Sequence, residues 1–116
     1  PFDYENHLTG EMIKAEDVDF LSRVFFLGQI HQTYPGSISC CTVAATVIPG
    51  TVPFEIRGTK SGKEINIGHP GGIVDVEAEC DWQNGNPVIT RVTYARTARR
   101  IMDGYCYVPK RCFEEE

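Results

Sequence analysis

One apolar stretch decides the fold, and it reads Ile38-Ser39-Cys40-Cys41-Thr42-Val43-Ala44-Ala45-Thr46-Val47-Ile48. Placed on a helix, these side chains leave no polar face, and a helix that is apolar all round has to be enclosed by other elements. We therefore expect a fully buried helix over residues 38–48. Pro35-Gly36 would form its entry turn, Ser37 is a favourable N-cap, and Pro49-Gly50 would end it.

Beyond about residue 52 the pattern changes to an alternation of apolar and polar residues, which is typical of strands buried on one face. Three such runs have their apolar faces at Ile65 and Ile67, at Val74, Val76 and Ala78, and at Val88, Thr90, Val92 and Tyr94. Residues 68–72 would link the first two strands, and Asn84-Gly85-Asn86 predicts a hairpin between the next two. Tyr105, Tyr107 and Val108 indicate a last strand that ends at Pro109.

The segment before the apolar stretch predicts an outer helix over residues 15–27. Its apolar residues recur at helical spacing, Glu16 and Asp17 lie in the first turn, where the helix dipole favours negative charge, and Gly28 is placed to stop it. The whole chain then forms an α+β fold in which a curved antiparallel sheet wraps around one buried central helix. Residues 1–116 would make a single lobe.

Length and charge favour a globular domain and argue against a nucleic-acid-binding or membrane-spanning protein. The chain has 116 residues, of which 41% are hydrophobic, and this is enough for one globular domain with a real core. Its net charge of −5 argues against a general nucleic-acid or polybasic membrane surface, and no apolar run is long enough to cross a bilayer. Glu114-Glu115-Glu116 is typical of a solvated tail. Because Pro1 is not a start methionine and no signal pattern follows it, we interpret the chain as a piece of a longer polypeptide.

The cysteines do not suggest a cross-linked or zinc-binding protein. Their number is odd, two are adjacent, and no pair has the C-x-x-C spacing; they are Cys40, Cys41, Cys80, Cys106 and Cys112. We expect reduced thiols in a cytoplasmic protein, several of them buried as small apolar residues, and no metal site. Whether Cys106 and Cys112 approach each other stays open.

Two glycine-containing turns are candidates for binding an anion. At the start of the buried helix, Gly36 would let a ligand approach free backbone N–H groups, while Ser37 and Ser39 add hydroxyl donors for a carboxylate or enolate oxygen. An ordinary N-cap explains Ser37 equally well. In Gly68-His69-Pro70-Gly71-Gly72, exposed N–H groups and His69 could hold the same kind of ligand, and the alternative is a plain turn with an exposed histidine.

A third candidate is the basic run Arg96-Thr97-Ala98-Arg99-Arg100. Its three arginines could clamp a polycarboxylate, or they could form a solvated face that pairs with acidic neighbours such as Asp103. A lone histidine such as His31 is more often a packing residue than a catalyst, and burial on the helix favours an inert thiol for Cys41.

Taken together, several segments resemble the PrpF family of methylaconitate and aconitate isomerases. The matching stretches are Phe26–His31, Ser39–Ala45, Ile48–Thr51, Ile67–Gly72, Arg96–Gly104 and Val108-Pro109, and their order and spacing fit across almost the whole chain. The His-Pro-x-Gly turn and the Arg-Thr-Ala-Arg-Arg run are the more specific signals. The resemblance implies a fold like that of diaminopimelate epimerase, in which two similar halves each wrap a curved sheet around a central helix and the active site lies between them. This chain would correspond to the C-terminal half.

The same resemblance implies a cofactor-independent isomerase. Members of the family move a double bond or change cis/trans geometry in small unsaturated di- and tricarboxylates, by removing an allylic proton and returning a proton at another carbon. Their acid–base pair, a cysteine and a lysine, is expected in the N-terminal half, so its roles are not transferred to Cys41 or Lys63 and the chain alone should be inactive. The residues expected to bind substrate carboxylates are Gly36, Ser37, Ser39, His69, Gly71 and Gly72, with Arg96 and Arg99 as weaker candidates.

Two positions depart from the pattern that the resemblance implies. The more distant epimerases carry a second catalytic cysteine just before the Gly-Ser/Thr that opens the central helix, and Pro35 stands there instead. Proline cannot exchange a proton, which disfavours a two-cysteine racemase mechanism. Gly71 stands where members often have the serine of His-Pro-Ser-Gly, and the lost hydroxyl could change substrate choice or weaken carboxylate binding by about 1 kcal/mol.

The expected partners are a small polycarboxylate substrate and the upstream lobe of the same protein. A homodimer is compatible with the sequence, whereas nucleic acid, a membrane and a cofactor are not expected. Two alternatives stay open. One is a non-catalytic module of the same fold that packs against a partner or dimerises, and the other is an epimerase that acts on an amino or hydroxy acid.

Overall fold

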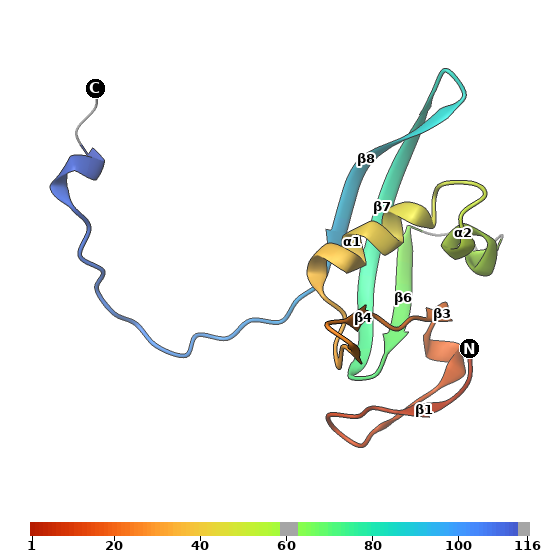
Figure 1. Ribbon diagram of the computed structural model, residues 1–116, viewed down its shortest axis with the longest axis horizontal. Helices are drawn as coiled ribbons and strands as arrows, with labels where there is room; N and C mark the ends of the chain where they lie inside the picture. Colours follow the sequence, from red (N-terminus) through yellow and green to blue (C-terminus); the bar gives the residue numbers. More distant parts are fainter. Residues whose placement is uncertain (59–62, 114–116) are drawn as a thin grey trace.

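The computed structural model describes residues 1–58 and 63–113 of the chain. At its centre lies a four-stranded sheet in the order β3-β6-β7-β8, formed by β3 (Phe20–Leu21), β6 (Glu64–His69), β7 (Gly72–Gln83) and β8 (Asn86–Tyr94) (Figure 1). β6 pairs with β7, and β7 with β8, in antiparallel orientation, which confirms the strands predicted from alternation. β3 runs parallel to β6, so the sheet is mixed and the expectation of a wholly antiparallel sheet is wrong.

The hairpin between β7 and β8 turns through Asn84 and Gly85, as predicted. Their φ angles of 53° and 80° both lie in the left-handed region that a tight two-residue hairpin turn requires. A register shift between Glu79 and Cys80 interrupts the pairing of the two strands. Such an irregularity bends a strand and increases its local twist, which gives the long hairpin its curvature.

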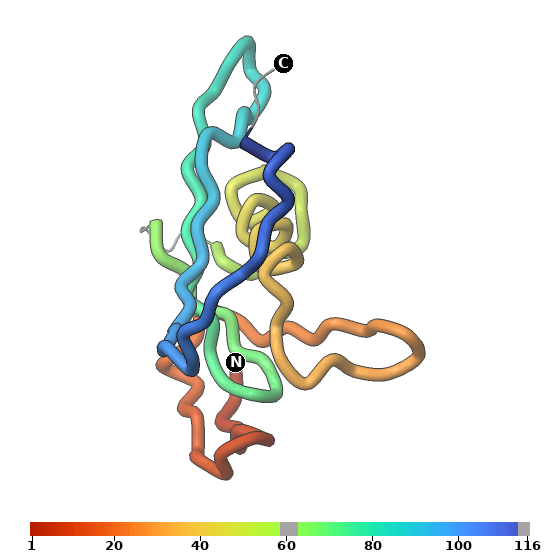
Figure 2. Tube along the Cα trace, turned by 90° about the vertical axis from the view of Figure 1, so that its left-hand side faces the viewer, coloured from red at the N-terminus to blue at the C-terminus, as the bar shows by residue number. Residues whose placement is uncertain are grey.

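Helix α1 (Gly36–Ala45) lies against one face of β7 and β8, as the tube view shows (Figure 2). The core between helix and sheet consists of Phe20, Val24, Tyr34, Val43, Ile65, Ile67, Val76 and Ala78. Ser39 and Val43 are the buried residues of the helix, while Cys41 is exposed. The expectation of a helix enclosed on all sides is therefore wrong for the described part of the chain, because one sheet covers one side of a helix.

Both ends of the helix predicted over residues 38–48 differ from expectation, since α1 begins at Gly36 and ends at Ala45. Pro35, with φ −62° and ψ 141°, occupies the N-cap position, and no side chain caps α1. Ser37 lies inside the helix, so its prediction as the N-cap is wrong. After α1 the chain forms a second helix, α2 (Val52–Arg57), which is too short to show a periodicity in the sequence. Thr51 caps α2, since its hydroxyl accepts a hydrogen bond from the Phe54 N–H at 3.3 Å.

No outer helix forms over residues 15–27. This segment contains a short 3-10 helix, η1 (Ala15–Asp17), then β3, and then β4 (Phe25–Phe26), which forms a hairpin with β5 (Gln29–Ile30) just beyond it. The Asp19 N–H donates to the Asn66 carbonyl oxygen, and the Asn66 N–H donates to Asp19 Oδ2, both at 2.8 Å. Pairing with β6 thus holds the segment extended. Gly28 and Leu27, with φ of 80° and 49°, form the β4–β5 turn, so Gly28 does not end a helix.

A hairpin at the N-terminus covers the turn between β6 and β7. It consists of β1 (Tyr4–Glu5) and β2 (Met12–Ile13). The Tyr4 hydroxyl donates to the Gly72 carbonyl oxygen at 2.7 Å, and the His7 N–H donates to the Pro70 carbonyl oxygen at 2.8 Å. These two hydrogen bonds hold the hairpin against the turn that follows His69.

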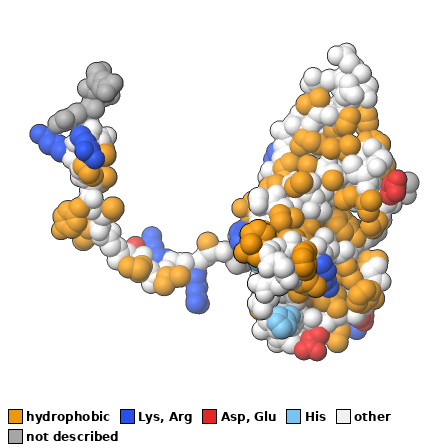
Figure 3. All heavy atoms as spheres, viewed as in Figure 1, with side chains coloured by type: hydrophobic (Ala, Val, Ile, Leu, Met, Phe, Trp, Pro, Cys, Tyr) orange, Lys and Arg blue, Asp and Glu red, His pale blue; other side chains and the backbone are white. Residues whose placement is uncertain are grey.

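The chain after β8 leaves the body of the molecule. Residues 95–109 run outward without forming a strand, and η2 (Lys110–Phe113) follows them (Figure 1). Tyr105 and Tyr107 are 101% and 98% exposed, and the space-filling view shows no part of the body around this segment (Figure 3). The prediction of a last strand at residues 105–108 is therefore wrong, because no described strand pairs with them. Residues 114–116, the predicted solvated tail, lie outside the described residues. Within residues 1–58 and 63–113, no helix has the length and apolar character needed to span a membrane.

Candidate functional site

A pocket of about 430 Å³ opens at one end of the sheet, where the β5–α1 connection meets the β6–β7 turn and the chain that leaves β8. We call it the His69 pocket. Its lining residues are Thr33, Tyr34, His69, Ile73, Val74, Asp75, Ala95, Arg96 and Thr97. The lining residues include a histidine, an arginine and two threonines beside a single acidic residue, Asp75. An arginine together with neutral hydrogen-bonding residues suits a small anion.

His69 is the last residue of β6 and is only 7% exposed. The Gly71 N–H donates to its Nδ1 at 3.2 Å, which places the proton of the neutral ring on Nε2. Burial, and to a lesser extent the positive charge of Arg23, lower the pKa of His69 below its ordinary value of 6.5. At neutral pH the ring is therefore uncharged, and Nε2–H is its remaining hydrogen-bond donor.

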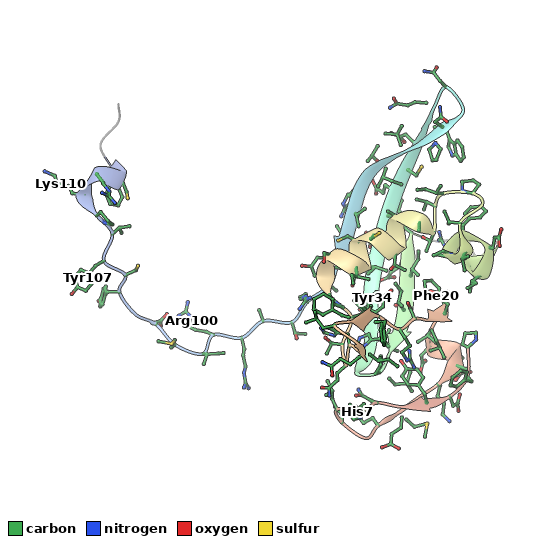
Figure 4. All side chains as sticks on the ribbon, viewed as in Figure 1. His7, Phe20, Tyr34, Arg100, Tyr107 and Lys110 are labelled. Atoms are coloured by element: carbon green, nitrogen blue, oxygen red, sulfur yellow. The ribbon has the colours of Figure 1, made fainter. Side chains whose placement is uncertain are left out.

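Tyr34 lies beside His69 in the core. The two rings stack with centroids 6.1 Å apart and planes at 26°. The Tyr34 hydroxyl lies 2.9 Å from Ser22 Oγ and 2.8 Å from Thr42 Oγ1, so it joins the end of β3 to helix α1. Figure 4 shows Tyr34 and Phe20 together under α1, in the body of the molecule.

Arg96 and Tyr94 connect the pocket with the start of α1. The Arg96 guanidinium lies over the Tyr94 ring, 5.3 Å from its centroid. A Cβ atom on Gly36 would lie 2.8 Å from both Cζ and the hydroxyl oxygen of Tyr94, so only glycine fits this position without displacing the ring. The start of α1 is thus close-packed against β8.

The predicted binding residues fall into two groups. Of the six residues predicted to bind substrate, His69 alone lines the pocket. Of the two weaker candidates, Arg96 lines it and Arg99 does not. Ser39 is fully buried, and its hydroxyl donates to the Pro35 carbonyl oxygen at 3.0 Å, so its proton is already engaged. Ser37 is exposed at the first turn of α1. None of these contacts tests ligand binding, and the set stays a prediction.

Gly71 and Gly72 follow His69 in the tight turn. A Cβ on Gly71 would lie 2.8 Å from Leu8 Cδ1 and 2.9 Å from the Gln32 carbonyl oxygen, so the absent serine hydroxyl has no free space in this conformation. Gly72 has a φ of 141°, which favours glycine, and its carbonyl oxygen accepts the bond from Tyr4. The turn is therefore packed under the N-terminal hairpin.

Some pocket residues were not among the predicted binding set. Thr33 and Tyr34 directly precede Pro35-Gly36, and Thr97 lies inside the arginine run, so their neighbours in sequence pointed near them. Asp75 belongs to the polar face of β7, and alternation alone gives it no functional signal. These residues come close to His69 only because segments that are distant in sequence pair and pack in the fold, which a local pattern does not reveal.

The remaining basic and sulfur-containing residues lie outside the pocket. Arg100 Nη1 lies 3.5 Å from Asp103 Oδ2 on the outgoing segment, where both side chains are exposed, as the alternative interpretation of the arginine run expects. All five cysteines are free, and none is buried, so the expectation of buried thiols is wrong. Among the described residues, no group of three or more His, Cys, Asp and Glu side chains could hold a metal ion.

Comparison with known proteins finds a family model and several relatives that are named as isomerases. The family model described as "PrpF protein" matches residues 1–109. The chain is 40% identical over 111 residues to 3-methylitaconate isomerase of Eubacterium barkeri, covering 95% of the chain and 28% of that protein. It is 32% identical over 102 residues to 2-methyl-aconitate isomerase of Shewanella oneidensis, covering 88% of the chain and 26% of that protein.

A solved structure agrees with these sequence matches. The crystal structure of methylitaconate-delta-isomerase superposes with a TM-score of 0.70 and 38% sequence identity, covering all of this chain and 29% of that one. The chain thus spans about a quarter to three tenths of the length of these relatives. Since the family model matches nearly the whole chain, this chain belongs to the PrpF protein family.

Proposed function

We propose that this chain supplies part of the C-terminal lobe of a cofactor-independent isomerase that acts on a small unsaturated di- or tricarboxylate, such as methylitaconate, methylaconitate or aconitate. The names of its relatives support the reaction class. The observation that carries the proposal is the His69 pocket, whose lining brings together His69, Arg96, Thr33 and Thr97 from distant parts of the chain. An arginine and neutral donors together suit a carboxylate.

The chemistry assigns this pocket a binding task. Isomerisation breaks a C–H bond at an allylic carbon, delocalises the electron pair toward a carboxylate, and forms a C–H bond at another carbon of the same system. Donors at the carboxylate oxygens stabilise the negative charge that develops there. The base that removes the proton and the acid that returns it are expected from a cysteine and a lysine elsewhere in the longer protein.

Gly36, Ser37, Gly71 and Gly72 remain proposed binding residues for the substrate carboxylates, and Ser39 would act only by supporting the start of α1, since its hydroxyl is bonded to Pro35. They lie in the first turns of α1 and in the β6–β7 turn, and none of them lines the pocket. Because the chain spans only 24% to 29% of its relatives, it would provide one wall of a cleft that another lobe completes.

The test compares the longer polypeptide with the isolated chain. In deuterated water, the longer protein should isomerise methylitaconate or trans-aconitate and place deuterium at the carbon that receives a proton, while the isolated chain should show no turnover. Added chelator should leave the rate unchanged. Turnover by the isolated chain would contradict the shared site.

A His69→Gln variant of the longer protein examines the pocket itself. A hydrogen bond to a charged group contributes about 1.5–3 kcal/mol, and 1.4 kcal/mol corresponds to about tenfold in affinity. We therefore expect the KM to rise about tenfold or more. His7→Gln, on the exposed N-terminal hairpin, is the matched control and should leave the KM unchanged. Equal KM values for all three proteins would exclude His69 from the site.

One observation favours a second candidate, a module that associates with another copy of itself. The outgoing segment carries exposed apolar side chains, among them Ile101 and Met102 at 87% and 80% exposure. Sedimentation of the isolated chain distinguishes the two. A stable dimer with no response to carboxylates would support the module, and a monomer that binds them would support the isomerase.

A further inference from the structure

Tyr34 makes an unusual set of contacts for a core residue. It is 6% exposed, and its hydroxyl is placed between two other hydroxyls, those of Ser22 and Thr42, at 2.9 and 2.8 Å. Ser22 follows β3, and Thr42 lies in the second turn of α1. The ring is therefore tied at its far end to two elements that pack on the same sheet.

The Tyr34 ring also stacks on the imidazole of His69. The 6.1 Å separation and 26° interplanar angle are within the range of favourable aromatic stacking. Among the described residues, the His69 ring has one hydrogen-bond partner, the Gly71 N–H, which donates to Nδ1 at 3.2 Å. A single hydrogen bond of this length fixes one ring nitrogen, and the stacked Tyr34 ring adds a contact that constrains the plane of the buried imidazole.

We infer that Tyr34 is a positioning residue for His69. Its ring, anchored by Ser22 and Thr42, holds the imidazole with Nδ1 toward the Gly71 N–H, so that Nε2–H stays available as a neutral donor. The charged groups near this imidazole are Arg23, beside the end of β6, and Asp75 and Arg96, in the pocket wall. The inference rests on the proposed function for the identity of the ligand, while the ring arrangement belongs to the free chain.

The chain has three histidines, so the test can follow one ring directly. In the ¹⁵N-labelled chain, long-range ¹H–¹⁵N correlation should show His69 as a single tautomer with protonated Nε2. Tyr34→Leu removes the ring and should give averaged shifts for the two nitrogens, together with a pKa nearer the ordinary value. Tyr34→Phe keeps the ring without its anchor and should fall between the two, as a partial rescue.

A second readout is hydrogen exchange at Gly71, whose N–H is the donor to His69. In Tyr34→Leu this amide should exchange about tenfold faster, as when local opening becomes about 1.4 kcal/mol easier, while the β6–β7 ladder keeps its protection. Tyr107→Phe removes the same hydroxyl as Tyr34→Phe, but at a fully exposed tyrosine, and it should alter neither the tautomer nor the exchange rate of Gly71. If Tyr34→Leu does not fold, Tyr34→Phe decides.

The positioning role is overturned if the folded variants keep the single Nε2–H tautomer and the wild-type Gly71 exchange rate. Adding trans-aconitate to the labelled longer protein, in which the other lobe completes the cleft, separates the two proposals. A wild-type His69 that holds its tautomer there but shows no shift with the acid leaves the positioning role standing and counts against the proposed function. If the acid shifts the His69 signals and the Tyr34 substitutions do not change that shift, the proposed function is supported and the positioning role is not.

Discussion

Gly71 shows how one residue can connect the turn of a candidate site to its support. The turn after His69 lies against Leu8 of the N-terminal hairpin and against the backbone of Gln32. A leucine side chain can move aside, but a carbonyl oxygen held in the chain cannot move without shifting the segment before α1. The backbone contact therefore decides which residue can stand here.

Gly71→Ser should destabilise the chain by about 1–3 kcal/mol, because its Cβ would lie 2.9 Å from the Gln32 carbonyl oxygen. Urea unfolding measures the difference. Gly104→Ala is the matched control, since nothing lies within 4 Å of a Cβ at that position, and it should change stability by less than about 0.5 kcal/mol. A stable Gly71→Ser protein would show that the segment at Gln32 adapts readily.

The lowered pKa of His69 makes stability depend on pH. Between the lowered pKa and the ordinary value of 6.5, the unfolded chain binds a proton that the folded chain does not. The stabilisation is complete above 6.5 and is lost as the pH falls through the folded pKa. We expect the free energy of unfolding to fall as the pH drops below about 6.5, and His69→Gln should flatten this slope.

Two carboxyl groups with lowered pKa values titrate outside this window, because hydrogen bonds from Lys14 and Lys63 hold the pKa of Asp3 and Glu79 below their ordinary values of 3.8 and 4.5. Chemical denaturation of the wild type and of His69→Gln between pH 7.5 and 5 gives the contribution of His69 as the difference between the two slopes. An unchanged slope in His69→Gln would assign the dependence to another group.

At the scale of elements, β6 organises the fold. It pairs with β3 on one side and with β7 on the other, and it carries His69 at its end. Ile65 and Ile67 point from it into the core, and both are almost completely buried. The same strand thus provides the middle of the core and the position of the candidate site.

Ile67→Ala should reduce the free energy of unfolding by about 2–5 kcal/mol, the range for removing a large apolar side chain from a packed core. Ile101→Ala is the same substitution on the outgoing segment, where the side chain is 87% exposed, and it should change stability by less than about 0.5 kcal/mol. Denaturant titration of both proteins gives the comparison. Equal effects would contradict the placement of these two isoleucines.

The whole molecule has a compact body and an extended C-terminal segment. Figure 4 shows Arg100, Tyr107 and Lys110 along that segment, well away from Tyr34. Its contacts with the body end near Arg96, which lies on the Tyr94 ring. The segment therefore contributes little to the stability of the body.

Removing residues 98–116 should leave the free energy of unfolding within about 0.5 kcal/mol of the original. In the intact chain, amides of residues 98–109 should exchange at rates close to those of an unfolded peptide, whereas those of β6 and β7 should be protected. Hydrogen exchange followed by mass spectrometry measures both regions at once. Protection of residues 98–109 would indicate that the segment packs on a surface, either of the same molecule or of a second copy.

The sequence predicted the elements whose signals are local. Alternation along Ile65 and Ile67, the Asn84-Gly85 turn and the apolar stretch of α1 each reflect the preferences of neighbouring residues, and all three are confirmed. Residues 15–27 have a helical spacing, but bonds between Asp19 and Asn66 hold part of them extended. That partner is 47 residues away in sequence, beyond the reach of any local pattern.

The sequence by itself determined the mixed helix-and-strand character, the sharp hairpin and His69 as a candidate ligand-binding residue, because side-chain alternation, left-handed turn residues and residue chemistry act over a few positions. Tertiary structure alone decided that Tyr34 stacks on His69, that Arg96 reaches the same pocket and that Gly71 has no room for a side chain. These contacts depend on how distant segments pack, and packing distances follow from the sum of all pairings in the fold.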